Sequence, residues 1–338
     1  MKHTSLLTSV AVVLAVVAGQ AMANEAYIDQ AQDNNTASID QAPGSPAQAG
    51  TSSDPILQDG NFNVLDIDQS GRSKAGTARN PNNLTGTTQS GIEQLGDRNE
   101  LTINQNQGQV FQVLQDASAA GGAEAATNKA VIIQSATATN IVKGVIQIYD
   151  GGSAANELEI NQNCGAGCTG NRVGIGTFNP QGGGVYQDGN SNTMDIDQVG
   201  AFNDVDWATQ IGEGNDAAIN QDGGRGNRVR NLEQTGDAND ATISLAGSWN
   251  GYDSFTPDTD SYAVGLTSGT VVQDGDNNFV ALDAIGDRNQ YAFSQSGNDN
   301  SISGVQTGNN NEVAVQQTGG GIANFTQSGN GNHLGVSQ

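Results

Sequence analysis

Residues 295–317 read QSGNDNSISGVQTGNNNEVAVQQ and contain one pattern twice. The pattern is Gln-x-Gly-x-x-Asn-x-Φ-x-Φ-x-Gln, where Φ is an apolar residue. Its two glutamines lie 11 residues apart, as from Gln295 to Gln306 and from Gln306 to Gln317. Variants of the pattern recur from Asn24 to Gln338. Because each copy of such a repeat must bury its apolar face on its neighbours, the repetition predicts a stacked array, and an enzyme is not expected.

The informative positions inside one unit are spaced by two residues, which is the periodicity of a β-strand. In residues 192–198 (NTMDIDQ) the Asn, Met, Ile and Gln side chains share one face, and Thr and the two Asp share the other. Four residues between units, such as 188–191 (DGNS), are typical of turns. Strands of about seven residues and turns of about four predict an all-β β-solenoid with coils of about 22 residues. Its strands would stack about 4.8 Å apart, as in the cross-β structure of amyloid.

The Asn and Gln residues of the repeat lie on the apolar face of these strands, so they are predicted to be buried. Stacked on their equivalents one coil away, their amides satisfy one another's hydrogen-bonding groups, and such ladders stabilise cross-β cores. A turn role alone would not require this fixed spacing. The predicted stacking residues are Asn63, Gln69, Asn99, Gln105, Asn192, Gln198, Asn215, Gln221, Asn278, Asn289, Gln295, Asn300, Gln306, Asn311, Gln317, Asn332 and Gln338.

Residues 1–23 are predicted to be a secretory signal peptide. Lys2 and His3 form a short basic region, residues 6–18 are apolar, and residues 21–23 (AMA) resemble a cleavage site. The apolar stretch is too short to cross a bilayer as a helix, so no membrane span is expected. Residues 24–338 are then predicted to form one β-solenoid domain. Its longer interruptions, which should bulge as surface loops, are residues 42–55, 72–82, 116–127, 163–170 and 246–266.

The composition is acidic, rich in glycine and poor in apolar residues. The net charge is −24, hydrophobic residues make up 35%, and there are 46 glycines. Composition alone would suggest disorder. The regular period instead indicates a fold, because a solenoid coil needs few apolar residues if hydrogen-bonded Asn and Gln fill the rest of its interior. The negative charge argues against nucleic acid as a partner, since phosphate binding requires many Lys and Arg residues.

The repeat closely resembles the curlin repeat of bacterial curli subunits, in which Ser or Asn, Gln, Gly, Asn and Gln recur at these spacings. The resemblance covers nearly all of residues 24–338 and is strongest over residues 273–317. It implies a secreted functional amyloid on a Gram-negative cell surface, used for biofilm matrix and adhesion. It also implies periplasmic chaperoning, export through an outer-membrane curli-type channel, and assembly with other curlin-like subunits or a nucleator. Leu245 and Ala284 replace expected glutamines, and the major, minor and nucleating roles stay open.

The ends of the repeat array also predict polymerisation. Solenoids that remain monomeric need polar caps, whereas half-repeats lie at residues 24–30 and 332–338. An uncovered strand edge can template another chain, so head-to-tail self-association is expected, with strands perpendicular to the fibre axis. The alternative function is a monomeric β-solenoid binding module on the cell surface, for a polysaccharide or ice. Ice binding would favour regular outward Thr arrays, and the outward positions here are mixed.

No catalytic, cofactor or metal site is predicted. His333 is the only histidine outside the predicted signal peptide, so Ser-His or Cys-His catalysis is not expected. The carboxylates are numerous but repetitive, so none stands out as an acid–base pair. Cys164 and Cys168 lie in one short loop and are predicted to form a local disulfide, which suits an exported protein. Trp207 is expected to point into the core.

Asp195 and Asp197 are expected on the outward face, together with similar Asp pairs in other coils. Carboxylates stacked one coil apart repel one another, and protonation or a divalent cation relieves the repulsion. One hypothesis is therefore that assembly is faster at mildly acidic pH or with Ca²⁺. The alternative is a solvated acidic face that keeps the unfolded chain soluble during export.

Overall fold

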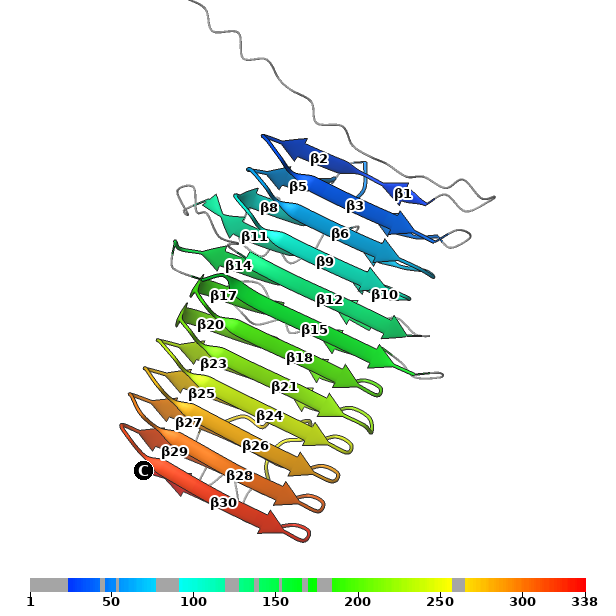
Figure 1. Cartoon of the computed structure of the whole chain (residues 1–338). Helices are drawn as coiled ribbons and strands as arrows, with labels where there is room; N and C mark the ends of the chain where they lie inside the picture. Colours follow the sequence, from blue (N-terminus) through cyan, green and yellow to red (C-terminus); the bar gives the residue numbers. More distant parts are fainter. Residues whose placement is uncertain are drawn as a thin grey trace, which may run out of the picture.

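The computed structural model describes residues 24–42, 46–52, 55–76, 91–118, 128–136, 140–151, 154–165, 170–174, 184–256 and 265–338, and these form an elongated β-solenoid (Figure 1). Each strand pairs in parallel with the equivalent strand one coil away. For example, β15 (Asn156–Cys164) pairs with β18 (Thr193–Val199) from Glu157 opposite Thr193 to Asn163 opposite Val199. The predicted all-β solenoid is thus confirmed.

Two long sheets, named B and C here, run the length of the described chain. Sheet B has twelve strands: β2 (Ile28–Ala31), β5 (Ile56–Asp59), β8 (Ile92–Gly96), β11 (Val113–Ala117), β14 (Val145–Tyr149), β17 (Gly184–Asn190), β20 (Trp207–Glu213), β23 (Asn231–Thr235), β25 (Thr270–Asp274), β27 (Gln290–Ser296), β29 (Glu312–Thr318) and β31 (His333–Ser337). Sheet C has eleven: β3 (Thr36–Gln41), β6 (Val64–Gln69), β9 (Glu100–Gln105), β12 (Asn128–Ala136), β15, β18, β21 (Asp216–Asp222), β24 (Asp240–Ala246), β26 (Phe279–Ile285), β28 (Ser301–Thr307) and β30 (Ile322–Ser328).

A third sheet, named A, adds a short side to the N-terminal coils, so the expectation of two strands in every coil was wrong. It has eight strands: β1 (Glu25–Ala26), β4 (Gln48–Ala49), β7 (Lys74–Ala75), β10 (Gly108–Val110), β13 (Asn140–Val142), β16 (Arg172–Val173), β19 (Asp204–Val205) and β22 (Arg228–Val229). Coil length also varies: equivalent glutamines lie 22 residues apart from Gln295 to Gln317 and 40 apart from Gln147 to Gln187.

In several coils one additional residue marks the corner between sheets A and B, although residues 24–30 form β1 and β2 without it. In residues 203–210 (NDVDWATQ) the Asn and Gln lie seven positions apart, and the segment forms two strands, β19 and β20. In residues 289–295 (NQYAFSQ) the spacing is six, and the single strand β27 spans it. The additional residue shifts the alternation, so Ala208 is buried and Trp207 is only partly buried, outside the core clusters. The expectation that Trp207 points into the core was therefore wrong.

The core is a set of stacked apolar columns between the sheets. In sheet C one column of fully buried isoleucines continues through seven successive coils: Ile67, Ile103, Ile132, Ile160, Ile196, Ile219 and Ile243. Near the C-terminal end the column passes to Gly304 and Phe325. A Cβ at Gly304 would lie 1.9 Å from Cζ of Phe325, so this glycine makes room for the ring.

The turns are stacked as closely as the strands. Gly286 has φ +119°, and a Cβ there would lie 2.1 Å from the carbonyl oxygen of Gly308 in the next coil, which explains the glycine of the repeat. The following residue binds the preceding coil: Asp287 Oδ1 accepts from the backbone N–H of Ser248, and Asn309 Oδ1 accepts from that of Asp287. The turns therefore add a polar ladder at the edge of the solenoid.

Candidate functional site

The most extensive polar array of the molecule is a column of glutamines inside sheet B. In ten successive hydrogen bonds of 2.5–3.1 Å, the Nε2 of each Gln donates to the Oε1 of the Gln one coil closer to the C-terminus. All ten bonds point in the same direction. The column consists of Gln30, Gln58, Gln94, Gln115, Gln147, Gln187, Gln210, Gln234, Gln273, Gln295 and Gln317.

A second hydrogen bond from the same amide links sheets B and C. Gln210 Nε2 donates to Gln234 Oε1 and to the backbone carbonyl of Thr193 on sheet C, at 2.9 Å in both cases. Gln234 repeats the arrangement with the carbonyl of Asp216. From Gln58 to Gln295 each amide of the column thus uses both N–H groups in an interior without exposure to solvent, whereas the buried Nε2 of Gln317 has no partner among the described residues. This matters because a buried donor without a partner costs about 1–3 kcal/mol.

A second glutamine column lies in sheet C and is interrupted once. Six bonds of 2.8–3.0 Å connect Gln41 to Gln221 through the intervening coils. Leu245 and Ala284 then occupy the column, in register with Gln221 and Gln306, and Gln306 resumes it by donating to Gln327 at 2.9 Å. Oε1 of Gln306 is buried and has no hydrogen-bond partner in the part of the chain that the structure describes. The two apolar residues therefore leave one orphaned acceptor where the column restarts.

Two asparagine columns run at the starts of the strands, and their bonds point the opposite way. The backbone N–H or the Nδ2 of each Asn donates to the Oδ1 of the Asn one coil closer to the N-terminus. One column, in sheet C, contains Asn35, Asn63, Asn99, Asn128, Asn156, Asn192, Asn215, Asn239, Asn278 and Asn300. The other, which continues from sheet A into sheet B, contains Asn140, Asn171, Asn203, Asn227, Asn250, Asn289, Asn311 and Asn332.

All the predicted stacking residues except Gln338 lie on these four columns, but they do not form a single ladder. From Asn63 to Gln317 they are at most 1% exposed, whereas Asn332 is half-buried and Gln338 is exposed in the last coil. Sequence reasoning missed most of the glutamines of sheet B and most of the Asn column that runs from sheet A into sheet B. In these units Asn and Gln lie seven positions apart instead of six, as in residues 140–147 and 227–234, and this spacing could have identified them.

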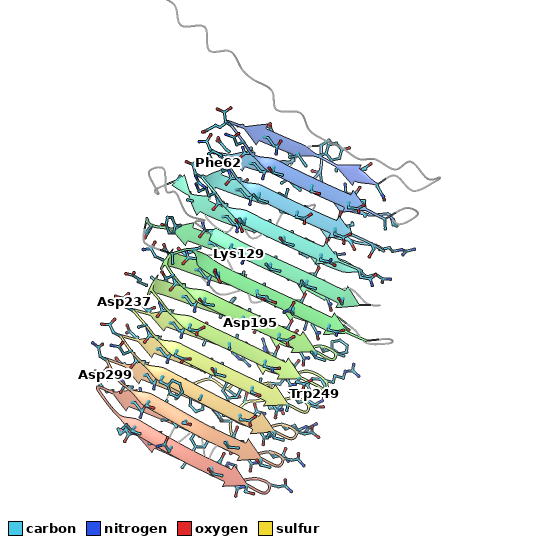
Figure 2. All side chains as sticks on the ribbon, in the orientation of Figure 1. Phe62, Lys129, Asp195, Asp237, Trp249 and Asp299 are labelled. Atoms are coloured by element: carbon cyan, nitrogen blue, oxygen red, sulfur yellow. The ribbon has the colours of Figure 1, made fainter. Side chains whose placement is uncertain are left out.

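The outer face of sheet C carries the predicted carboxylates. Asp195, labelled on this face with Lys129 in Figure 2, has a raised pKa because burial disfavours its charge and because Glu159 and Asp197 add like charge. Burial likewise raises the pKa of Asp240. A shallow groove of about 180 Å³ passes Lys129, Glu159 and Asp195 between the coils. The carboxylates of this face thus repel one another at neutral pH.

Ion pairs on sheet A were not predicted. Arg172 holds Asp204 of the next coil through Nη2–Oδ2 at 2.6 Å and Nε–Oδ1 at 2.8 Å, and this contact raises the pKa of the guanidinium. Arg228 donates from both Nε and Nη2 to one oxygen, Oδ2, of the buried Asp206 in the preceding coil. The sequence signal for the first pair is that Arg172 and Asp204 each follow an Asn of the same column. Stacking then brings these opposite charges together.

The insertion after β24 reaches the C-terminal coils. The backbone N–H and the Oγ1 of Thr256 donate to the carboxylate of Glu312 at 2.8–3.0 Å. His333 Nδ1 lies 3.2 Å from both Thr256 Oγ1 and Glu312 Oε2. A hollow of about 310 Å³ beside them is also lined by Asp253 and Arg288. Sequence reasoning could not place this contact, because the loop meets residues more than fifty positions away.

The remaining predictions concern chemistry. Cys164 is buried and disulfide-bonded, and its predicted partner Cys168 lies outside the described residues. Among the described residues, no group of three or more His, Cys, Asp or Glu side chains is arranged to hold a metal ion. Within the same part of the chain, no helix is long and apolar enough to cross a membrane.

No protein-family model, no curated protein and no solved structure matches this chain. Its function must therefore be inferred from the repeat and from the geometry of the columns.

Proposed function

We propose that this chain is a secreted structural subunit that polymerises end to end into curli-like extracellular amyloid fibres, for biofilm matrix and cell adhesion. The columns of amides and apolar residues are periodic along the solenoid axis, so a further coil of the same kind can be added at either end. Export through a curli-type outer-membrane channel and assembly with curlin-like subunits or a nucleator belong to this proposal through the resemblance of the repeat.

One observation carries the proposal: the end coils present the interior of the solenoid. Among the described residues, β2 and β3 at one end, and β30 and β31 at the other, each have a neighbouring strand on one side only. Apolar side chains of these strands and of β1 pack on the core and stay partly exposed, namely Ala26, Ile28, Ala37, Ile39, Phe325, Leu334 and Val336. An unpaired strand edge above an apolar face is a template for another chain.

Fibre diffraction on residues 24–338, diluted from denaturant, tests the proposal. We expect a meridional reflection near 4.7–4.8 Å and an equatorial one near 10 Å. A folded β protein that stays monomeric at high concentration would overturn the proposal and favour the binding-module function.

A pair of variants tests whether elongation uses the last coil of the solenoid. Val336 of β31 packs on the apolar core at this end, and its neighbour Gly335 lies on the opposite, outward face of the strand. Val336→Asp should abolish elongation, because it buries an unpaired charge at the contact, and the chain should keep its β-sheet circular dichroism. Gly335→Asp is the matched control and should elongate nearly normally. Equal elongation of both variants would place the contact elsewhere.

A further inference from the structure

The two long sheets contain unequal numbers of strands. In the described residues sheet B has twelve strands and sheet C has eleven, because β31 has no sheet C strand after it. A second copy whose β2 followed β31 within sheet B would leave one strand position empty in sheet C. Its β3 would then lie roughly 9.6 Å from β30, twice the usual spacing of about 4.8 Å. That arrangement leaves the edge of β30 unpaired.

We propose that consecutive copies in the fibre are related by a half-turn about the solenoid axis, so that sheet B of one copy continues as sheet C of the next. This inference rests on the proposed function and adds the geometry of the subunit contact. β2 of the second copy then follows β30, and its β3 follows β31. Every strand position is filled, and the strand–turn–strand path continues without a gap.

The half-turn is allowed because the four end units have the same spacing. Residues 24–30 (NEAYIDQ), 35–41 (NTASIDQ) and 332–338 (NHLGVSQ) each place Asn and Gln six positions apart. Residues 321–327 (GIANFTQ) have the same length, with Gly in the Asn position. None of them has the additional residue found between Asn and Gln in units such as 203–210, although residues 24–30 still form β1 in sheet A and β2 in sheet B. Units from the two sheets are therefore interchangeable at the ends, although they are not in the middle of the solenoid.

The side chains match in this register. On one side Ile28 of the second copy lies over Phe325, and Gln30 of the second copy lies over Gln327. On the other side Ile39 of the second copy lies over Val336, with Gln41 over Gln338. The remaining inward pairs are Ala26 over Ala323 and Ala37 over Leu334. The outward acids Asp29 and Asp40 meet Thr326 and Ser337, so no carboxylates oppose each other at the contact.

The direction of the glutamine bonds fixes the polarity of the contact. Gln30 and Gln41 donate through Nε2 to the next coil, so their Oε1 atoms face the N-terminal end. At the C-terminal end, Gln327 uses one N–H on the carbonyl of Glu312, which leaves the other directed along the axis. Donors therefore meet acceptors only when the C-terminal end of one copy contacts the N-terminal end of the next.

Disulfide trapping in assembled fibres distinguishes the two registers. Asp40, Asp29 and Ser337 are all exposed on outward faces. In the half-turn register, position 337 lies beside position 40 of the next copy, and without the half-turn it lies beside position 29. Adjacent strands about 4.8 Å apart lie within the Cα range of disulfides, roughly 4.4–6.8 Å. The test variants are Asp40→Cys/Ser337→Cys and the matched control Asp29→Cys/Ser337→Cys, oxidised after assembly.

We expect the 40/337 variant to give a ladder of covalent multimers on a non-reducing gel and the 29/337 variant to remain monomeric. The reverse result, or fibres in which neither pair cross-links, would overturn the half-turn. If the unmodified chain forms no fibres, the proposed function itself fails, and the half-turn fails with it. Electron microscopy gives a second readout. Each copy adds roughly 55 Å along the axis, from twenty-three half-coils, and sheet A should alternate between opposite sides, with a repeat of about 110 Å.

Discussion

At the scale of single residues, the amide side chains act as structural bonds. A glutamine inside the sheet B column, such as Gln210, accepts one hydrogen bond, donates two, and so connects three coils and both long sheets. Removing its side chain leaves the amides on either side without a partner. The interruption at Leu245 and Ala284 shows that the fold tolerates one gap in a column, with the acceptor of Gln306 left without a partner among the described residues.

Gln210→Ala should lower the free energy of unfolding by about 2–4 kcal/mol, because the buried amides of Gln187 and Gln234 each lose a partner. The exposed Gln316 in β29 provides the matched control, and Gln316→Ala should change stability by less than about 0.5 kcal/mol. Urea unfolding of the soluble protein, followed by circular dichroism, measures both. Similar values for the two variants would contradict a structural role for the column.

At the scale of an element, the outer face of sheet C couples neighbouring strands through charge. Asp195 has a raised pKa in the folded protein, so the folded state binds more protons than the unfolded state as pH passes between the two pKa values. Its contribution to stability is therefore present below the unfolded pKa, about 3.9, and is lost as pH rises through the folded pKa.

Asp195→Asn should accordingly stabilise the protein at pH 7 and give no gain near pH 3.5. The expected gain is under about 1 kcal/mol, because the carboxylate is partly exposed and solvent screens it. Urea midpoints at the two pH values measure the effect. Ser303→Asn on the same face, where the directly paired residues Ala281 and Asn324 are uncharged, is the control and should show no such pH dependence. A stabilisation that is equal at both pH values would show that charge is not the cause.

At the scale of the whole molecule, a net charge of −24 opposes the association of copies. We expect elongation to be faster at pH 5 than at pH 8, because raised pKa values bring carboxylates such as Asp195 and Asp240 toward neutrality first. Added NaCl at pH 8 should remove most of the difference by screening. Because screening depends on ionic charge, Ca²⁺ and Mg²⁺ should act alike. Elongation rates that do not change with pH or salt would contradict this electrostatic account.

The repeat determined the solenoid, the strand faces and the burial of the amides, because each depends on the two-residue alternation within one unit. The tertiary structure alone decided the contacts between units, since coils of 21 to 40 residues bring together positions that no local pattern relates. Thus β19 turned into a third side before β20, and Arg172 met Asp204 only through stacking. The tertiary structure also decided that sheet B has one strand more than sheet C, so that no described sheet C strand follows β31. Alternation is a property of the backbone of one strand, whereas registry between coils depends on the lengths of all the loops that separate them.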